Sequence, residues 1–300
     1  MSVVFIFGDL VTDLPESRLA LTVLMPVLAP DPRYFPAAVL SILEQTRRDF
    51  ELLIIEDPSD RSGADQLAGL KDDRIRHVQN PRRTSLVEQL NQGLDLARGD
   101  LVARMDADDL AEPDRLQVQS ERFERDGSLG VIGSQLAVID GEDRLLGYRE
   151  YPCNHEEILA CLPRFNPLAH PTVMFRRKVV QSAGGYRDYP MCEDYELWSR
   201  LAIQGVRFAN HPRPLLRYRV HPGASKSTRL RGMLRGTLKL KEQYYRGRMD
   251  GKARARLWGE RILTLLPASM IMGLFLRMTL KKRLPLSESD SSVEAAERRP

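Results

Sequence analysis

Cysteine is scarce in this chain of 300 residues, and its positions suit neither a metal site nor a disulfide framework. Cys153, Cys161 and Cys192 are an odd number, and no CxxC pair occurs among them. This usage is typical of a reducing compartment, so the sequence predicts a cytoplasmic protein. Residues 1–18, a lead-in to the main domain, have no basic segment and carry Asp9, so we expect no secretory signal.

A long hydrophobic run is also missing. The stretch 262–276 has 15 residues without a charge, but it contains Pro267, and a membrane-spanning helix needs about 20 apolar residues. Basic residues flank the stretch, including the cluster 281–283. We expect an interfacial helix that lies on an anionic membrane. A helix that packs on the main domain is the alternative.

Charge is divided unevenly along the chain. Residues 1–225 contain 27 Lys and Arg against 34 Asp and Glu, a net charge of −7, whereas residues 226–283 contain 16 basic and 3 acidic residues, a net charge of +13. We predict a basic helical extension at 226–284 that binds an anionic partner such as phospholipid, with a solvated helix as the alternative. No nucleic-acid-binding motif accompanies the charge, so we expect no nucleic-acid partner. Residues 285–300 are polar, and this composition predicts a disordered tail.

Residues 19–225 alternate between apolar runs and amphipathic segments. The pattern predicts an α/β domain with a mostly parallel central sheet and flanking helices. Expected strands are 19–27, 50–55, 75–78, 101–105, 130–139, 172–175 and 215–220. Expected helices are 35–45, 86–97, 115–125, a segment that begins at 193, and 226–256.

Acidic groups follow two of the expected strands, at the edge where open α/β sheets bind ligands. Asp57 and Asp60 follow one strand, and the cluster 106–109, Asp-Ala-Asp-Asp, follows another. Three carboxylates in four residues repel one another unless a cation or water compensates them, so the cluster is a candidate metal site. A solvated turn or helix cap is the alternative. An EF-hand is excluded, because its pattern needs Gly at Ala111 and Glu at Gln117.

The order of these parts resembles the family 2 glycosyltransferases over residues 21–227. The resemblance rests on nine short segments in the family's order and spacing: 21–27, 40–46, 51–60, 90–93, 103–109, 170–172, 184–187, 193–198 and 218–221. It implies a GT-A fold and inverting transfer of a sugar from a nucleotide-sugar donor, with Mg²⁺ or Mn²⁺ as the metal. We also expect a glycan or lipid-linked acceptor. The basic section and the uncharged stretch, rather than the family motifs, predict a place at the inner face of the cytoplasmic membrane.

The resemblance also implies roles for residues on the donor side. Asp57 matches the carboxylate that recognises the nucleotide base, with Asp60 as a weaker second and Arg104 on the same nucleotide side. Asp106 and Asp108 match the DxD pair. Asp108 is expected on the metal and Asp106 on the ribose or metal, since hard cations prefer oxygen ligands. Asp109 is expected to be structural.

On the acceptor side, Asp194 matches the catalytic base, because inversion requires a carboxylate that takes the proton of the attacking hydroxyl. Glu193 is expected to orient the acceptor or the loop, although carboxylates are favoured at a helix N-terminus in any case. His221 is expected beside the metal. Arg219, His170 and Trp198 are assigned to the diphosphate or acceptor side.

Three departures from the family pattern leave the donor open, and one of them is that residues 81–84, Pro-Arg-Arg-Thr, replace the Gly expected after Asn80. Residues 28–30 read Leu-Ala-Pro where the family often has an aromatic residue and Asn, and 56–59 read Glu-Asp-Pro-Ser where Asp-Asp-Gly-Ser is usual. A nucleotidyltransferase and a non-catalytic nucleotide-sugar sensor are the alternatives. The first should carry a Gly-rich basic loop after its first strand, and residues 28–32 contain neither Gly nor Lys.

Overall fold

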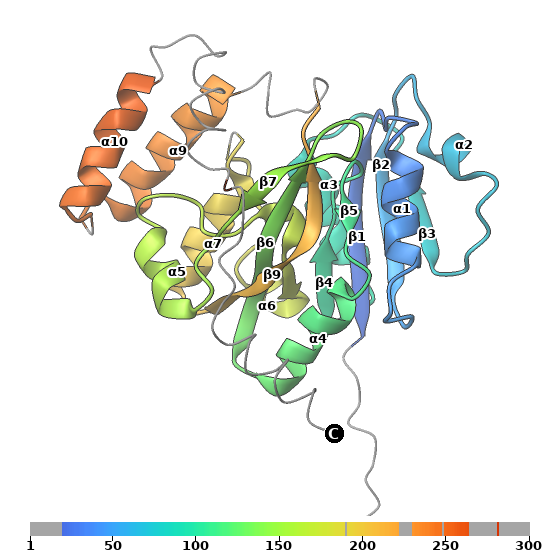
Figure 1. The fold of residues 1–300 in the computed structure, drawn as a ribbon, viewed down its shortest axis with the longest axis horizontal. Helices are drawn as coiled ribbons and strands as arrows, with labels where there is room; N and C mark the ends of the chain where they lie inside the picture. Colours follow the sequence, from blue (N-terminus) through green and yellow to red (C-terminus); the bar gives the residue numbers. More distant parts are fainter. Residues whose placement is uncertain (1–19, 190, 222–229, 248, 264–280, 282–300) are drawn as a thin grey trace, which may run out of the picture.

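The computed structural model describes residues 20–189, 191–221, 230–247, 249–263 and 281. Within these residues, a nine-stranded sheet forms the centre of the molecule and helices cover both of its faces (Figure 1). The strand order is β3-β2-β1-β4-β8-β6-β9-β5, and β7 pairs with β6. The predicted lead-in at 1–18, the predicted tail and residues 264–276 of the uncharged stretch lie outside the described residues.

The first half of the chain forms parallel β–α units, and each element except α2 lies close to its predicted range. Its elements are β1 (Leu21–Leu28), α1 (Phe35–Leu43), β2 (Glu51–Asp57), α2 (Gly63–Leu67), β3 (Ile75–Gln79), α3 (Leu86–Leu96) and β4 (Leu101–Arg104). Strand β1 pairs in parallel with both β2 and β4. The chain therefore turns in opposite directions on the two sides of β1, which is where open α/β sheets form a ligand crevice.

The second half adds mostly antiparallel strands to the β4 edge. Its elements are β5 (Leu110–Ala111), α4 (Arg115–Arg125), β6 (Leu129–Ile139), β7 (Leu145–Arg149), α5 (His155–Cys161), the 3₁₀ helix η1 (His170–Thr172), β8 (Met174–Arg176), α6 (Arg177–Ser182), α7 (Glu193–Ile203) and β9 (Arg207–Arg219). The strand predicted at 172–175 is wrong at its start, because Thr172 belongs to η1 and pairing begins at Met174. The pattern does not predict β5, β7, α5 or α6.

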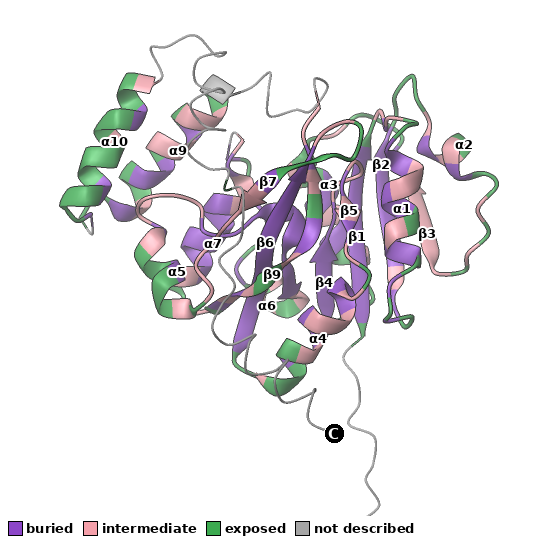
Figure 2. Ribbon diagram, viewed as in Figure 1, coloured by how far each residue is buried: buried purple, intermediate pink, exposed green. Residues whose placement is uncertain are grey.

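The core consists of two layers, one on each face of the sheet. Successive side chains of a strand point to opposite faces, so Val23 and Met25 pack with α1 and α4, whereas Leu24 packs with α3 and α7. Strands β1, β4 and β6 are buried along almost their whole length, as Figure 2 shows. A mixed α/β sheet with flanking helices is therefore confirmed.

The basic C-terminal region forms two helices, α9 (Leu230–Tyr245) and α10 (Gly251–Leu263), side by side at the end of the molecule away from β3 (Figure 1). The prediction of one helical segment over 226–256 is wrong, because α9 ends at Tyr245 and Asp250 begins a new helix, its carboxylate accepting from the Ala253 N–H at 2.7 Å. Leu240 and Met249 are buried in the same cluster as Trp198 of α7. Among the described helices, none combines the length and apolar content that crossing a membrane requires.

A buried ion pair joins the two C-terminal helices. The Lys241 ammonium donates to both carboxylate oxygens of Glu260, at 2.7 and 2.6 Å, and to the carbonyl of Arg164 at 2.5 Å. In addition, the Tyr244 hydroxyl donates to Glu196 of α7 at 2.5 Å. These contacts tie α9 and α10 to the body of the molecule.

We expect Glu260→Ala to lower the free energy of unfolding by about 3 kcal/mol, because Lys241 then stays buried without its carboxylate. Glu242→Ala is the matched control: it removes an ion pair to Arg261 between the same two helices, but both partners are nearly half exposed. That change should cost less than about 1 kcal/mol. Urea unfolding of both variants measures the difference, and equal losses would contradict the buried-pair account.

Candidate functional site

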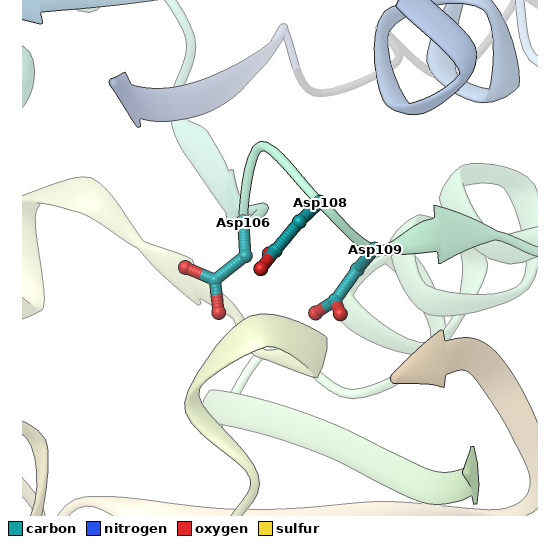
Figure 3. Close-up of side chains that lie close together, drawn as sticks. All are labelled: Asp106, Asp108 and Asp109. Carbon is teal, nitrogen blue, oxygen red and sulfur yellow. The ribbon is translucent and has the colours of Figure 1, made fainter. Parts of the chain in front are cut away.

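The cluster 106–109 lies at the carboxyl edge of the sheet, in the loop between β4 and β5. The Met105 N–H donates to the carbonyl of Leu24 at 3.0 Å on one side of the loop, and on the other side β5 pairs with β9. Both ends of the loop are therefore anchored to strands. Asp106, Asp108 and Asp109 point to the same side of it (Figure 3), with one oxygen of each within 4.8 Å of the others.

Asp109 is the buried member of the cluster. Its Oδ1 accepts from the Arg219 N–H at 2.9 Å, as expected for a structural residue, but its buried Oδ2 has no hydrogen-bond partner among the described residues. Burial, together with the charges of Asp108 and Asp106, raises the pKa of Asp109 well above its usual value. An orphaned carboxylate oxygen among three converging carboxylates is a set of donors that fits a hard divalent cation such as Mg²⁺ or Mn²⁺.

Arg104 lies directly beneath the cluster. Its guanidinium forms an ion pair with Asp106 and is almost completely buried. Burial opposes its charge, but the neighbouring Asp106 outweighs this effect and raises the pKa of Arg104. The resemblance assigns Arg104 to the nucleotide side, and in the structure its guanidinium pairs with Asp106 of the DxD pair.

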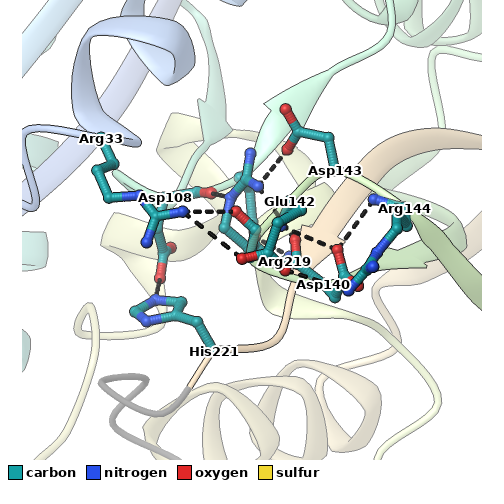
Figure 4. Close-up of polar contacts among 10 residues, drawn as sticks. Arg33, Asp108, Asp140, Glu142, Asp143, Arg144, Arg219 and His221 are labelled. Carbon is teal, nitrogen blue, oxygen red and sulfur yellow. Dashed lines mark hydrogen bonds and ion pairs between the residues drawn. The ribbon is translucent and has the colours of Figure 1, made fainter.

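His221 and Arg219, at the end of β9, reach the cluster from the opposite side of the loop (Figure 4). His221 Nε2 lies 3.0 Å from Asp108 Oδ2, and Arg219 Nε donates to the carbonyl of Asp108 at 2.8 Å. The Arg219 guanidinium also lies over the ring of Tyr34, 4.4 Å from its centre, and donates to the carbonyl of Asp140 at 3.2 Å. Arg219 is 2% exposed, so it holds the loop rather than projecting into solvent.

Asp57 ends β2 and is almost completely buried. Its Oδ1 accepts from Asn80 Nδ2 at 2.8 Å, its Oδ2 accepts from the Thr84 N–H at 2.6 Å, and the Thr84 hydroxyl lies 2.9 Å from both oxygens. Burial raises the pKa of Asp57, but the hydrogen bonds from Asn80 and Thr84 outweigh it, so the pKa is lowered. Asp60, in contrast, is exposed on the following loop.

Asp194 lies at the N-terminus of α7, where the helix dipole stabilises negative charge. Its Oδ2 accepts from Asn166 Nδ2 at 2.8 Å, and its Oδ1 accepts from the Tyr195 N–H at 2.7 Å. The carboxylate is partly exposed. It is therefore oriented by protein donors at a partly exposed position.

A polar series lies between the cluster and α7. His170 Nε2 lies 2.9 Å from the Tyr186 hydroxyl, and His170 Nδ1 lies 4.0 Å from a Glu193 oxygen. Burial raises the pKa of Tyr186, and the nearby charge of Arg104 opposes this effect. Trp198 is fully buried with its ring edge-on to His170, 6.1 Å away. The structure thus brings His170, Glu193 and Arg104 together around a tyrosine.

Several residues of the site have no predicted role. Tyr186 lies in the matched segment 184–187, so its position is the one available signal. Tyr34, Asn80 and Asn166 lie in loops, and nothing in their local sequence distinguishes them from other loop residues. Each acquires its place through contact with a residue far away in the chain.

The lowered pKa of Asp57 predicts a pH-dependent contribution to stability. Because the folded-state pKa lies below the unfolded value of about 3.9, this contribution is present above that pH and is lost as the pH falls through the folded-state pKa. Asp57→Asn should lower the free energy of unfolding by about 2 kcal/mol at neutral pH, and its difference from wild type should shrink below about pH 4. Urea unfolding over a pH series tests this. The exposed Asp60→Asn is the control, and a pH-independent loss in Asp57→Asn would refute the assignment.

Comparisons with known proteins identify relatives of this chain. The model of glycosyl transferase family 2 matches residues 22–184, more than half of the chain, and ends before α7. An O-antigen biosynthesis glycosyltransferase of Escherichia coli, WbnJ, is 32% identical over 203 residues, which are 66% of this chain and 79% of that protein. An uncharacterized glycosyltransferase of Haemophilus influenzae is 29% identical over 207 residues, 65% of this chain and 64% of the relative's own length.

The fold is also that of a solved glycosyltransferase. The mannosyltransferase PcManGT of Pyrobaculum calidifontis, solved in complex with GDP-Man and Mn²⁺, superposes with a TM-score of 0.54 at 15% identity, covering 94% of this chain and 81% of that one. This likeness shows the GT-A fold, as the sequence predicts. Together with the family match, it identifies the chain as a member of glycosyl transferase family 2.

Proposed function

We propose that the protein is a metal-dependent, inverting glycosyltransferase that moves a sugar from a nucleotide-diphospho-sugar to a hydroxyl of a glycan or lipid-linked oligosaccharide. The observation that carries this proposal is the cluster of three converging carboxylates at the sheet edge. Asp194 and Glu193 at the N-terminus of α7 supply a second pair of carboxylates. The named role of WbnJ in O-antigen biosynthesis supports a polysaccharide product. The GDP-Man and Mn²⁺ of PcManGT support the donor class and the metal.

On the donor side, the residues of the cluster have separate tasks. Asp108 and Asp106 would hold Mg²⁺ or Mn²⁺, with the Asp109 oxygen behind them and His221 beside Asp108. The bound ion would supply positive charge for the diphosphate leaving group. Asp57 accepts hydrogen bonds from Asn80 and Thr84, which follow the neighbouring strand β3. We assign Asp57 to recognition of the nucleotide base. Asp60 is assigned there as a second, exposed contact.

On the acceptor side, Asp194 is the general base. Its carboxylate takes the proton of the acceptor hydroxyl while that oxygen forms a bond to the anomeric carbon, on the face opposite the nucleotide. The bond from the anomeric carbon to the diphosphate breaks, and the nucleoside diphosphate leaves with the electron pair. Asn166 orients Asp194, and His170 positions Glu193 beside it.

The proposed location in the cell rests on the positive charge of the C-terminal section. We assign the protein to the cytoplasm, peripherally at the inner face of the membrane, because the section 226–283 carries a net charge of +13 beside an acidic body. Lipid-linked acceptors are reached at such a surface. The division into a catalytic domain at 19–225 and an extension at 226–284 remains a prediction.

Metal removal should abolish turnover. Chelation with EDTA should stop hydrolysis and transfer for a panel of nucleotide sugars, and Mn²⁺ or Mg²⁺ should restore both. Asp108→Ala should reduce turnover by about 100-fold or more, since it removes charge stabilisation of the leaving group. Asp95→Ala, an exposed carboxylate on α3, is the control. Full activity of the wild type in EDTA would disprove the metal requirement.

The base assignment has a separate test. Asp194→Asn should reduce kcat by about 10³-fold and leave the affinity for the donor nucleotide unchanged, because the amide keeps the shape of the side chain but accepts no proton. Glu193→Gln should have a smaller effect. If Asp194→Asn keeps full transfer activity, Asp194 is not the base. No turnover by wild type on any donor, with membrane extract as the source of acceptor, would favour a sensor instead.

A further inference from the structure

The outer face of α10 is apolar at its centre. Trp258 is 64% exposed and Ile262 is 59% exposed, and they lie one helical turn apart. Gly251 and Ala255, also exposed, continue the same stripe toward the start of the helix. Figure 2 shows α10 exposed over most of its length. A solvated helix normally places charged or polar residues on its outer face, so this stripe is unusual.

The rotation of α10 is fixed by its inner face. Ala253 is 1% exposed, and Glu260 forms the buried ion pair with Lys241 of α9. These two residues lie on the side of the helix opposite Trp258 and Ile262, as the 3.6-residue period requires. The apolar stripe is therefore held away from α9 by a specific polar contact.

Positive charges border the stripe on both sides. The exposed residue Lys252 lies along one edge, and Arg254 and Arg261 lie along the other. Arg256 belongs to the inner face, where it pairs with Glu260 at 3.0 Å, and Arg261 also pairs with Glu242 of α9. The Arg261 guanidinium lies over the Trp258 ring, 5.3 Å from its centre. Glu260 is the one acidic residue in the sequence of α10, and it is buried. Every exposed charge of this helix is thus positive.

We propose that α10 docks on an anionic phospholipid membrane, with Trp258 and Ile262 inserted among the headgroups and the flanking Lys and Arg residues on lipid phosphates. An apolar centre with an aromatic residue and cationic edges is the pattern of an interfacial helix. The proposal rests on the peripheral location proposed above and names the residues that produce it. The uncharged stretch 262–276 follows directly in the sequence and begins with the same Ile262.

The docking helix is connected to the catalytic helix. Lys241 joins α10 to α9, and the Tyr244 hydroxyl of α9 donates to Glu196 in the first turn of α7, the helix that begins with Glu193 and Asp194. Lys281, in contrast, pairs with Glu150 on the body of the molecule, so we assign it no lipid contact.

Tryptophan fluorescence of the full chain tests the proposal directly. The sequence contains two tryptophans, and Trp198 is fully buried, so the difference between wild type and Trp258→Phe isolates the emission of Trp258. Vesicles of phosphatidylcholine with phosphatidylglycerol should shift this emission to the blue, and brominated lipid should quench it. Vesicles of phosphatidylcholine alone should produce neither effect. An unchanged Trp258 emission with the anionic vesicles would overturn the proposal.

Co-sedimentation with the same vesicles compares the binding of wild type with that of matched variants. Trp258→Ala with Ile262→Ala, and separately Lys252→Gln with Arg254→Gln, should each weaken binding by about tenfold or more. Leu145→Ala with Leu146→Ala, which removes two comparably exposed apolar side chains from β7, should leave binding unchanged. Equal binding by all variants would overturn the proposal. So would a concentration-dependent dimer, without vesicles, that Trp258→Ala with Ile262→Ala abolishes.

These measurements contain no nucleotide sugar, so they stand apart from the transfer assay. Turnover of donor with a soluble acceptor should be the same in wild type and in the α10 variants, which also shows that the variants fold. If the wild type turns over no donor, the proposed reaction is refuted and the docking result is unaffected. If the wild type does not bind the anionic vesicles, the docking proposal is refuted and the proposed reaction is unaffected.

Discussion

Repulsion among Asp106, Asp108 and Asp109 is the constraint on which the rest of the site depends. Their oxygens lie within 4.8 Å of one another, and like charges at such distances are costly in a partly buried setting. The protein compensates for this with the charge of Arg104 and with polar contacts. Arg104 pairs with Asp106, and His221 lies against Asp108. The loop is therefore held in an arrangement that an added cation would relieve.

Buried arginines in the core also offset the negative charge of the cluster. The Arg115 guanidinium is fully buried and donates to the carbonyl of Arg104 at 2.7 Å, and burial lowers the pKa of Arg115 to about 9. Such a group costs free energy unless hydrogen bonds and nearby carboxylates stabilise its charge. Arg219 contributes from the opposite side, through its bonds to the backbone of Asp108 and to Asp109. The buried arginines and the acidic loop thus stabilise one another.

The C-terminal helices α9 and α10 pack in the same hydrophobic cluster as α7. Leu240 and Met249 share a hydrophobic cluster with Trp198, and Trp198 packs edge-on to His170. The basic region is therefore part of the packing that supports α7. The sequence prediction treats it as a separate extension because composition and charge change abruptly after residue 225, although the packing is continuous among the described residues.

The sequence by itself determined the elements whose signal is local. Apolar runs and 3.6-residue periods placed β1, β2, β4, α1, α3 and α4, because burial of a continuous face is encoded within each segment. The order of short motifs determined the family and the candidates Asp57, Asp108 and Asp194. Tertiary structure alone decided what had no local signal. The two-residue strand β5 exists because β9 pairs with it, and Tyr34 and Tyr186 join the site through partners distant in the chain. The outward direction of Trp258 follows from the Lys241–Glu260 pair, since the rotation of a helix is set by what its other face contacts.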